Sequence, residues 1–411
     1  MLTIRSKLNA MPYLKLVAHI YIICVVAFSN IAASAGILQT IGLTTTKIIF
    51  AVLTIMVINN LTKVQQIYFP RKLLLLSIFV LYVTTYAFLS PYDYEIMTLV
   101  FVYFTALFYS YIFDSINDIY DMLKSIVVGC VILIIMLLFV CGSVSNLLIV
   151  ISNEELSELL IQKNIIAFLM AQGGIICVFL GIYKKAPVYY ILLIPILFLL
   201  LGTGSRRGLF SFIFGGGLLY LLNGNGIRLI KNIIMTMFMM YILYIAINQL
   251  EIFQSINKRL SSLIEGFIGT STMTTSDQSR FKMINYGWNM FKINPIIGYG
   301  PGAFKEIAGF GKYSHNNYVE LLFNLGFIGF ILFYGHFCKI FYTLIQQFKE
   351  KDPLCLFFII YLAVRLISDI GNVSYYDKLL FIIFGTVVAY IDIVKNQDYN
   401  IYEEQKMANR G

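Results

Sequence analysis

Apolar residues in this 411-residue chain gather into long, nearly uninterrupted runs that are separated by short polar segments. A helix that crosses the hydrocarbon core of a bilayer needs about 20 mostly apolar residues. By this measure the pattern predicts about twelve membrane-spanning helices, near residues 13–33, 39–59, 73–90, 95–113, 124–143, 164–183, 187–202, 207–223, 229–249, 318–345, 354–371 and 378–394. The predicted fold class is therefore all-α, a polytopic integral membrane protein.

The composition supports a lipid environment. Hydrophobic residues make up 59% of the chain and charged residues only 12%, against roughly 25% charged residues in ordinary soluble domains. Such a chain cannot hide its apolar surface in a water-soluble core. The six cysteines lie within or beside apolar runs, with no C-x-x-C pair and no histidine at metal-ligand spacing. Neither a disulfide framework nor a metal centre is predicted.

The net charge of +9 is explained by orientation in the membrane. If the N-terminus is cytoplasmic, most short loops on the cytoplasmic side carry Lys or Arg, which is the usual bias. The short loops on the other side carry only Lys163, Arg206, Arg207 and Lys378. We therefore expect both termini in the cytoplasm. No nucleic-acid partner is expected, because the sequence shows no basic stripe with interleaved aromatic residues.

One long polar interruption divides the chain into a bundle of about nine helices (1–249), an outward-facing loop subdomain (250–316), C-terminal spanning helices (317–394) and a cytoplasmic tail (395–411). Within the loop, apolar residues at helical spacing predict two amphipathic helices, one over Ile256, Leu260, Leu263, Ile264 and Phe267, the other over Phe281, Ile284, Trp288 and Phe291. The segment NPIIGYGPGAF (294–304) follows, and its Pro and Gly residues predict a tight turn.

Arginines break the charge bias on the outward face. Arg206 and Arg207 begin the predicted span near 207–223, where free backbone N–H groups and the positive end of the helix dipole favour a phosphate. Arg280 lies in TSDQSRFKMINYGW, where Asp277 or Ser276 is expected to cap a helix and leave Arg280 in its first turn. The planar guanidinium fork suits a diphosphate better than a lysine does.

Each candidate also has an ordinary structural interpretation. Arg206 and Arg207 can anchor a helix end at lipid headgroups, and Arg280 can be a solvated loop charge. His315 can be a polar residue at the entrance of a span, and the Gly/Pro cluster can be a turn and nothing more. Arg365 and Asp369 lie one helical turn apart in YLAVRLISDIGN and can pair with each other, although charges within a span are functional candidates by default.

Taken together, four motifs resemble the O-antigen polymerase and O-antigen ligase superfamily, which consists of polytopic membrane glycosyltransferases that use polyprenyl-diphosphate-linked glycans. These motifs are T-G-S-R before a span, S-R near the start of a loop helix (Ser279, Arg280), N-P-I-I-G-Y-G-P-G, and H-N-x-Y-x-E-x-L-x-x-x-G-x-I-G. They cover residues 200 to 330. Asp369 with Ser374-Tyr375-Tyr376 is similar to the capsular and exopolysaccharide branch of the polymerases.

The resemblance implies diphosphate binding by Arg206 and Arg280 and a catalytic polar role for His315, and Arg207 is a candidate substrate-binding residue. We expect His315 to act as a general base, because its unperturbed pKa near 6.5 suits that task. Glu320, about one turn further along the chain, is expected to orient His315 or to be the base itself, and Asn316 to hold a sugar hydroxyl. The tyrosines expected to stack on sugars are Tyr299, Tyr313 and Tyr318. The further candidate substrate-binding residues are Ser205, Gly300, Gly302, Arg365 and Asp369.

The resemblance implies a metal-independent enzyme without a cofactor, in the bacterial cytoplasmic membrane, with its active site on the periplasmic or extracellular face. The expected partners are the lipid bilayer, a polyprenyl-diphosphate-linked oligosaccharide, and a chain-length regulator and flippase of the same pathway. A polymerase is preferred because of the S-Y-Y region. The alternatives are a ligase that transfers finished glycan to a lipid or protein acceptor, and a carrier of lipid-linked glycan. A carrier would place polar residues near the midplane of several spans.

Overall fold

The structure, a computed structural model, describes residues 12–28, 37–63, 69–92, 96–147, 163–223, 275–348 and 352–408, with a few single residues between 230 and 245. Its regular elements are all helical in these segments. They are α1 (Pro12–Phe28), α2 (Ile37–Leu61), η2 (Arg71–Leu73), α3 (Leu74–Leu89), α4 (Ile96–Ile112), α5 (Ile116–Cys141), α7 (Lys163–Tyr183), α8 (Val188–Gly202), α9 (Arg206–Leu222), α12 (Thr275–Ile293), α13 (Ala303–Ile307), α14 (Asn317–Gln347), α15 (Pro353–Ser368) and α16 (Lys378–Ala408).

The helices follow the hydropathy pattern closely. Every predicted span within the described residues coincides with a helix, and six helices are long and apolar enough to cross a membrane, with α1, α4, α8 and α15 as shorter apolar helices. The predicted span near 229–249 and the amphipathic helix over 256–267 lie outside the described residues. The second amphipathic helix is α12. Helix α16 continues to Ala408, so it runs through the predicted boundary between the last span and the tail.

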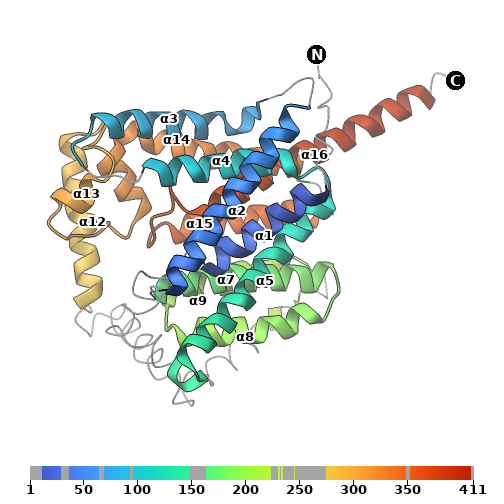
Figure 1. Cartoon of the computed structure of the whole chain (residues 1–411), viewed down its shortest axis with the longest axis horizontal. Helices are drawn as coiled ribbons and strands as arrows, with labels where there is room; N and C mark the ends of the chain where they lie inside the picture. Colours follow the sequence, from blue (N-terminus) through green and yellow to red (C-terminus); the bar gives the residue numbers. More distant parts are fainter. Residues whose placement is uncertain are drawn as a thin grey trace.

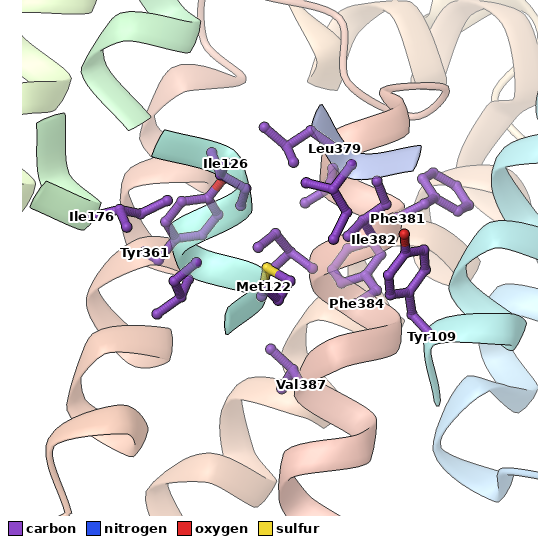
Figure 2. Close-up of a cluster of buried hydrophobic side chains, with 14 of the residues drawn as sticks. Tyr109, Met122, Ile126, Ile176, Tyr361, Leu379, Phe381, Ile382, Phe384 and Val387 are labelled. Carbon is purple, nitrogen blue, oxygen red and sulfur yellow. The ribbon is translucent and has the colours of Figure 1, made fainter. Parts of the chain in front are cut away.

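The core lies where α4, α5, α7, α15 and α16 meet, and its side chains are shown in Figure 2, with Tyr109, Met122, Ile126, Ile176, Tyr361, Leu379, Phe381, Ile382, Phe384 and Val387 labelled. Helix α16 is central, because nearly every residue from Leu379 to Ile391 is buried. Gly385 lets it approach α4, since a Cβ there would lie 2.9 Å from Cβ of Tyr109 and closer still to the carbonyl oxygen of Ala106. This contact fixes the last helix against the first half of the chain.

Helices α12 and α13 pack at one edge of the bundle, beside the ends of α3 and α14 (Figure 1). Helix α9 packs against α7 and α15, and α14 packs against α3, α12 and α15. Arg206 and Arg207 lie at the start of α9, and His315 and Asn316 lie just before α14.

Candidate functional site

Helix α9 begins at the paired arginines. Ser205 is the N-cap residue and Arg206 the first helical residue, so the expected helix N-terminus beside two guanidiniums is confirmed. Ser205 is buried, and its hydroxyl donates a hydrogen bond to Oδ1 of Asn164 on α7, at 3.2 Å. Its backbone N–H donates to the hydroxyl of Thr203 at 3.2 Å. Ser205 therefore ties the start of α9 to α7.

Arg207, Arg280 and His315 converge from three separate segments of the chain. His315 lies just before α14, and burial, then Arg280, Arg207 and Lys312, lower the pKa of His315 to about 4. The desolvated imidazolium is disfavoured and the neighbouring cations repel it. The histidine is therefore neutral near pH 7, with a free lone pair on one ring nitrogen.

Tyr313 is part of the same cluster. Its ring centroid lies 4.4 Å from that of His315. Burial and then Glu320 raise the pKa of Tyr313, whereas Arg207 and Arg280 lower it. The backbone of His315 has φ 57, in the left-handed region that residues other than glycine seldom adopt. The surrounding contacts thus hold the histidine in an uncommon conformation, as often happens at functional sites.

The two adjacent arginines do not occupy equivalent positions. Consecutive residues of an α-helix point about 100° apart, so the two side chains leave the helix in different directions. Arg207 is the member of the pair that acts electrostatically on both His315 and Tyr313, and its guanidinium packs against Gly371. The sequence motif placed more weight on Arg206, because helical phase cannot be seen in a motif.

The expected cap of the loop helix is wrong. Helix α12 has already begun at Thr275, so Ser276 and Asp277 lie inside it and Arg280 lies beyond its first turn. Arg280 still reaches the cluster around His315, which means that its place in the site comes from the packing of α12 rather than from a helix terminus.

The Pro/Gly segment forms the expected turn, and it docks into a break in α14. Gly326 has φ 62 and ψ −165 in the middle of that helix, so its two halves are not continuous. The turn supplies the missing partners on both sides of the break. The carbonyls of Phe323 and Asn324 accept from N–H groups of Tyr299 (2.9 Å) and Gly300 (2.8 Å), and the N–H groups of Phe327 and Ile328 donate to carbonyls of Pro295 (2.8 Å) and Ile296 (3.2 Å).

Gly300 and Gly302 were expected to contact substrate, and the structure gives them structural tasks. Gly300 has φ 111, and a Cβ there would lie 2.5 Å from the hydroxyl oxygen of Ser90. Gly302 has φ 80 and precedes α13 as its N-cap. Only glycine adopts such backbone conformations without strain, so these residues shape the turn that supports α14.

Glu320 binds the backbone next to His315 rather than the imidazole. Its carboxylate is buried and accepts from the N–H of Ser314 at 2.6 Å and from Nδ2 of Asn324 at 3.1 Å. The expectation that Glu320 orients the ring of His315 therefore changes to an indirect role, in which the carboxylate fixes the loop that carries the histidine.

Asn316 caps α14 instead of presenting its amide to a sugar. Its Oδ1 accepts from the N–H of Val319 at 3.0 Å, and its Nδ2 donates to the carbonyl of Ile370 at 3.1 Å. Tyr318 is also committed to the fold, since its hydroxyl donates to the carbonyl of Leu366 at 2.8 Å and its ring stacks on Tyr334. Tyr299 donates to the carbonyl of Met290.

The side chains of Arg365 and Asp369 have other hydrogen-bond partners, and the two residues are joined by a backbone hydrogen bond from the N–H of Asp369 to the carbonyl of Arg365, at 3.1 Å. Helix α15 ends at Ser368, with Asp369 as its C-cap, and the carboxylate of Asp369 accepts from the hydroxyl of Tyr334 (2.9 Å) and Nδ2 of Asn317 (3.2 Å). Arg365 instead forms an ion pair with Asp377, at 2.9 Å between Nη2 and Oδ2.

Arg365 is almost completely buried, with 1% of its surface exposed. Its guanidinium lies over the ring of Phe168, at 4.5 Å from the centroid. Asp377 also accepts from the N–H of Leu380, so the ion pair fixes the turn between α15 and α16. Arg365 therefore helps to fix this turn through Nη2, while its Nε and Nη1 are buried without a hydrogen-bond partner among the residues that the structure describes.

Sequence reasoning missed Asn317, Asn324, Gly371 and Asp377. The clearest is Asn317, which is fully buried and whose Oδ1 accepts from the N–H groups of Ser374 and Tyr375. The Asn-Asn pair at a span entrance was a usable signal, because only one of two adjacent asparagines can cap a helix. Gly371, just past the end of α15, matches the usual place of glycine after a helix.

The fold and the site together define a class: a polytopic helical membrane protein with a cationic cluster and a neutral histidine where the two halves of its bundle meet. Residues 191–334 match the family model described as O-Antigen ligase. This match supports the resemblance of the chain to the O-antigen ligase and polymerase superfamily, whose glycosyltransferase-like enzymes act on lipid-linked glycans in membranes. No curated protein matches the chain.

Proposed function

We propose that the protein is a polysaccharide polymerase that joins polyprenyl-diphosphate-linked oligosaccharide repeat units on the outer face of the bacterial cytoplasmic membrane. The convergence of Arg207, Arg280 and His315 carries this proposal. Arg207 in the first turn of α9 and Arg280 on α12 both act on His315, and two such guanidiniums suit a diphosphate, with Arg206 as a further cation at the start of α9. A neutral imidazole within the same cluster suits the removal of a proton.

The proposed reaction is a displacement at the anomeric carbon of the donor sugar. The oxygen of an acceptor hydroxyl forms a bond to that carbon, the bond from the carbon to the diphosphate oxygen breaks, and the acceptor proton passes to His315. Polyprenyl diphosphate leaves with the bonding electron pair. The guanidiniums of Arg207 and Arg280 stabilise the negative charge that grows on the leaving oxygen, and one such preorganised donor contributes on the order of 3 kcal/mol.

The low pKa of His315 fits a base that becomes active when the donor binds. Without a donor, burial and then repulsion by two arginines and Lys312 disfavour a proton on the imidazole. A bound diphosphate neutralises part of that charge, so the pKa of His315 rises toward its ordinary value. The histidine is then a stronger base in the presence of its substrate.

The test uses purified protein in lipid vesicles, given polyprenyl-diphosphate oligosaccharide from its own pathway, with and without chelator. A ladder of repeat units on a gel that persists with chelator and is lost in Arg280→Ala and His315→Ala supports a metal-independent polymerase. Release of diphosphate lipid only when a separate acceptor is supplied contradicts the polymerase and identifies a ligase. Transport of intact donor across the bilayer without turnover makes the protein a carrier.

The expected partners in the cell, a flippase and a chain-length regulator, can be tested with the same assay. Adding the regulator of the same pathway should narrow the distribution of ladder lengths without changing the initial rate of donor consumption. An unchanged distribution would contradict that partnership.

A further inference from the structure

Helices α9 and α15 share an antiparallel interface of small residues that ends at Arg207. The hydroxyl oxygens of Ser211 and Ser368 are 3.1 Å apart, and one turn further along α9 a Cβ on Gly215 would lie 3.0 Å from Cγ2 of Val364. Residues 207, 211 and 215 follow one another at four-residue spacing and therefore lie on one face of α9. Arg207 is thus at the N-terminal end of this face and lies beside the residues just beyond α15.

The guanidinium of Arg207 lies where a side chain of residue 371 would begin. A Cβ on Gly371 would lie 2.5 Å from Nε of Arg207 and closer still to Nη1 and Cζ. Gly371 is buried, and its N–H donates to the carbonyl of Ser368 at 3.0 Å, so the turn cannot move aside easily. The absent side chain is what leaves room for the arginine.

The same turn holds the segment that carries His315. The carbonyl of Asp369 accepts from the N–H of Asn317 at 2.8 Å, and the carbonyl of Ile370 accepts from Nδ2 of Asn316 at 3.1 Å. Three successive residues, 369 to 371, therefore contact the start of α14 on one side and Arg207 on the other. The turn lies between the two groups that act together in the site.

We propose that the turn 369–371 sets the spacing between Arg207 and His315, with Gly371 as the positioning residue that seats the guanidinium. This inference rests on the proposed function, since it specifies how that site is held in its working geometry. The residue acts only through Arg207 and touches neither the donor nor the acceptor.

An alanine at position 371 tests the position of the Arg207 guanidinium separately from the folding of the protein. The atoms that its methyl group would meet belong to the far end of a flexible side chain, so the arginine can swing away while the helices stay in place. A displacement of about 1 Å in a catalytic constellation can cost roughly 10²-fold in rate. We expect Gly371→Ala to fold normally and to lower the polymerisation rate by that order.

The experiment is a double-mutant cycle of Gly371→Ala with Arg207→Ala, measured as the initial rate of donor consumption in lipid vesicles. If the glycine acts through the guanidinium, Gly371→Ala lowers the rate when Arg207 is present. In a protein that already carries Arg207→Ala, it has no further effect. Gly217→Ala, in α9 at a place where a Cβ meets open space, is the matched control and should match the wild type.

Equal losses in both backgrounds would overturn the proposal, because they would mean that the methyl group disturbs something other than Arg207. An unchanged rate in the single Gly371→Ala variant would overturn it as well. The same cycle can be measured without turnover as the binding of polyprenyl diphosphate. Binding is monitored by the fluorescence of Trp288 on α12, the single tryptophan of the chain. If Gly371→Ala weakens this binding only when Arg207 is present, the positioning role is supported. A wild-type protein that binds in this way but forms no polymer would reject the proposed polymerase function and leave the positioning role standing.

Discussion

Replacing Gly326 by alanine should release the Pro/Gly turn from the break in α14. Residue 326 combines φ 62 with ψ −165, a backbone region that is essentially restricted to glycine and costs other residues about 1–3 kcal/mol. A Cβ there would also lie 2.6 Å from the N–H nitrogen of Gly298 and closer still to the carbonyl of Ile296. Because the obstacle is backbone, a side-chain rotation cannot remove it.

The magnitude follows from the bonds across the break. Four backbone hydrogen bonds join the turn to the two halves of α14, and at about 1 kcal/mol each they contribute about 4 kcal/mol. We expect the alanine variant to lose most of this docking free energy. The N–H groups of Tyr299, Gly300, Phe327 and Ile328 should then exchange with solvent deuterium up to about 10³-fold faster, since each 1.4 kcal/mol is about tenfold.

The assay is hydrogen–deuterium exchange with peptide-level detection on protein in nanodiscs, together with the melting temperature and the rate of polymer formation. Gly335→Ala is the control, because it lies in the same helix and its nearest neighbour is a side-chain carbon 3.7 Å away. Unchanged exchange of the turn in Gly326→Ala, with an unchanged melting temperature, would show that the turn does not depend on this glycine and would refute the reasoning.

Three further predictions concern charge. Because the pKa of His315 is about 4, its protonation should lower kcat/KM only as the pH falls toward about 4. Arg280→Gln removes a repelling cation and should move this acid limb of the pH profile to higher pH. An acid limb that does not move would contradict the electrostatic effect of Arg280 on His315. Glu320→Gln replaces the carboxylate with an amide, so that an NH₂ group faces one of the two hydrogen-bond donors, the N–H of Ser314 or Nδ2 of Asn324. It should destabilise the protein by about 1–3 kcal/mol, which would be measured as a lower melting temperature. Lys15→Met removes the ion pairs of Lys15 with Asp114 and Asp118, each 2.8 Å long. It should lower the melting temperature slightly without changing the rate per folded molecule. A changed rate would link these ion pairs to the site.

The spanning helices could be predicted from the sequence because hydropathy is a local signal. A run such as 124–143 contains enough information to specify a helix in lipid, whatever it packs against, and the structure extends it only at its polar start, to Ile116. The break at Gly326 could not be predicted in this way. NLGFIGF looks like an ordinary part of a span, and the reason for the break is the earlier turn at residues 295–300, which supplies its hydrogen bonds.

The site could be predicted only as a set of residues, not as an arrangement. The motifs named His315 and the arginines, but the choice between Arg206 and Arg207 depends on the helical phase of α9 relative to α15. The roles of Glu320 and Asn316 depend on which backbone groups lack partners, and that is decided by tertiary packing. Gly371 carries no chemistry of its own, so no motif search directs attention to it.

The seat of Arg207 also orders events during synthesis of the protein. Arg207 belongs to α9, whereas its contact with Gly371 and the hydrogen bonds of Asn317 need the segment between α15 and α16, which is synthesised much later. A chain still emerging from the ribosome has the cation but not the surface that aims it. The guanidinium therefore reaches its position in the fold only after α15 and the turn that follows it have joined the bundle.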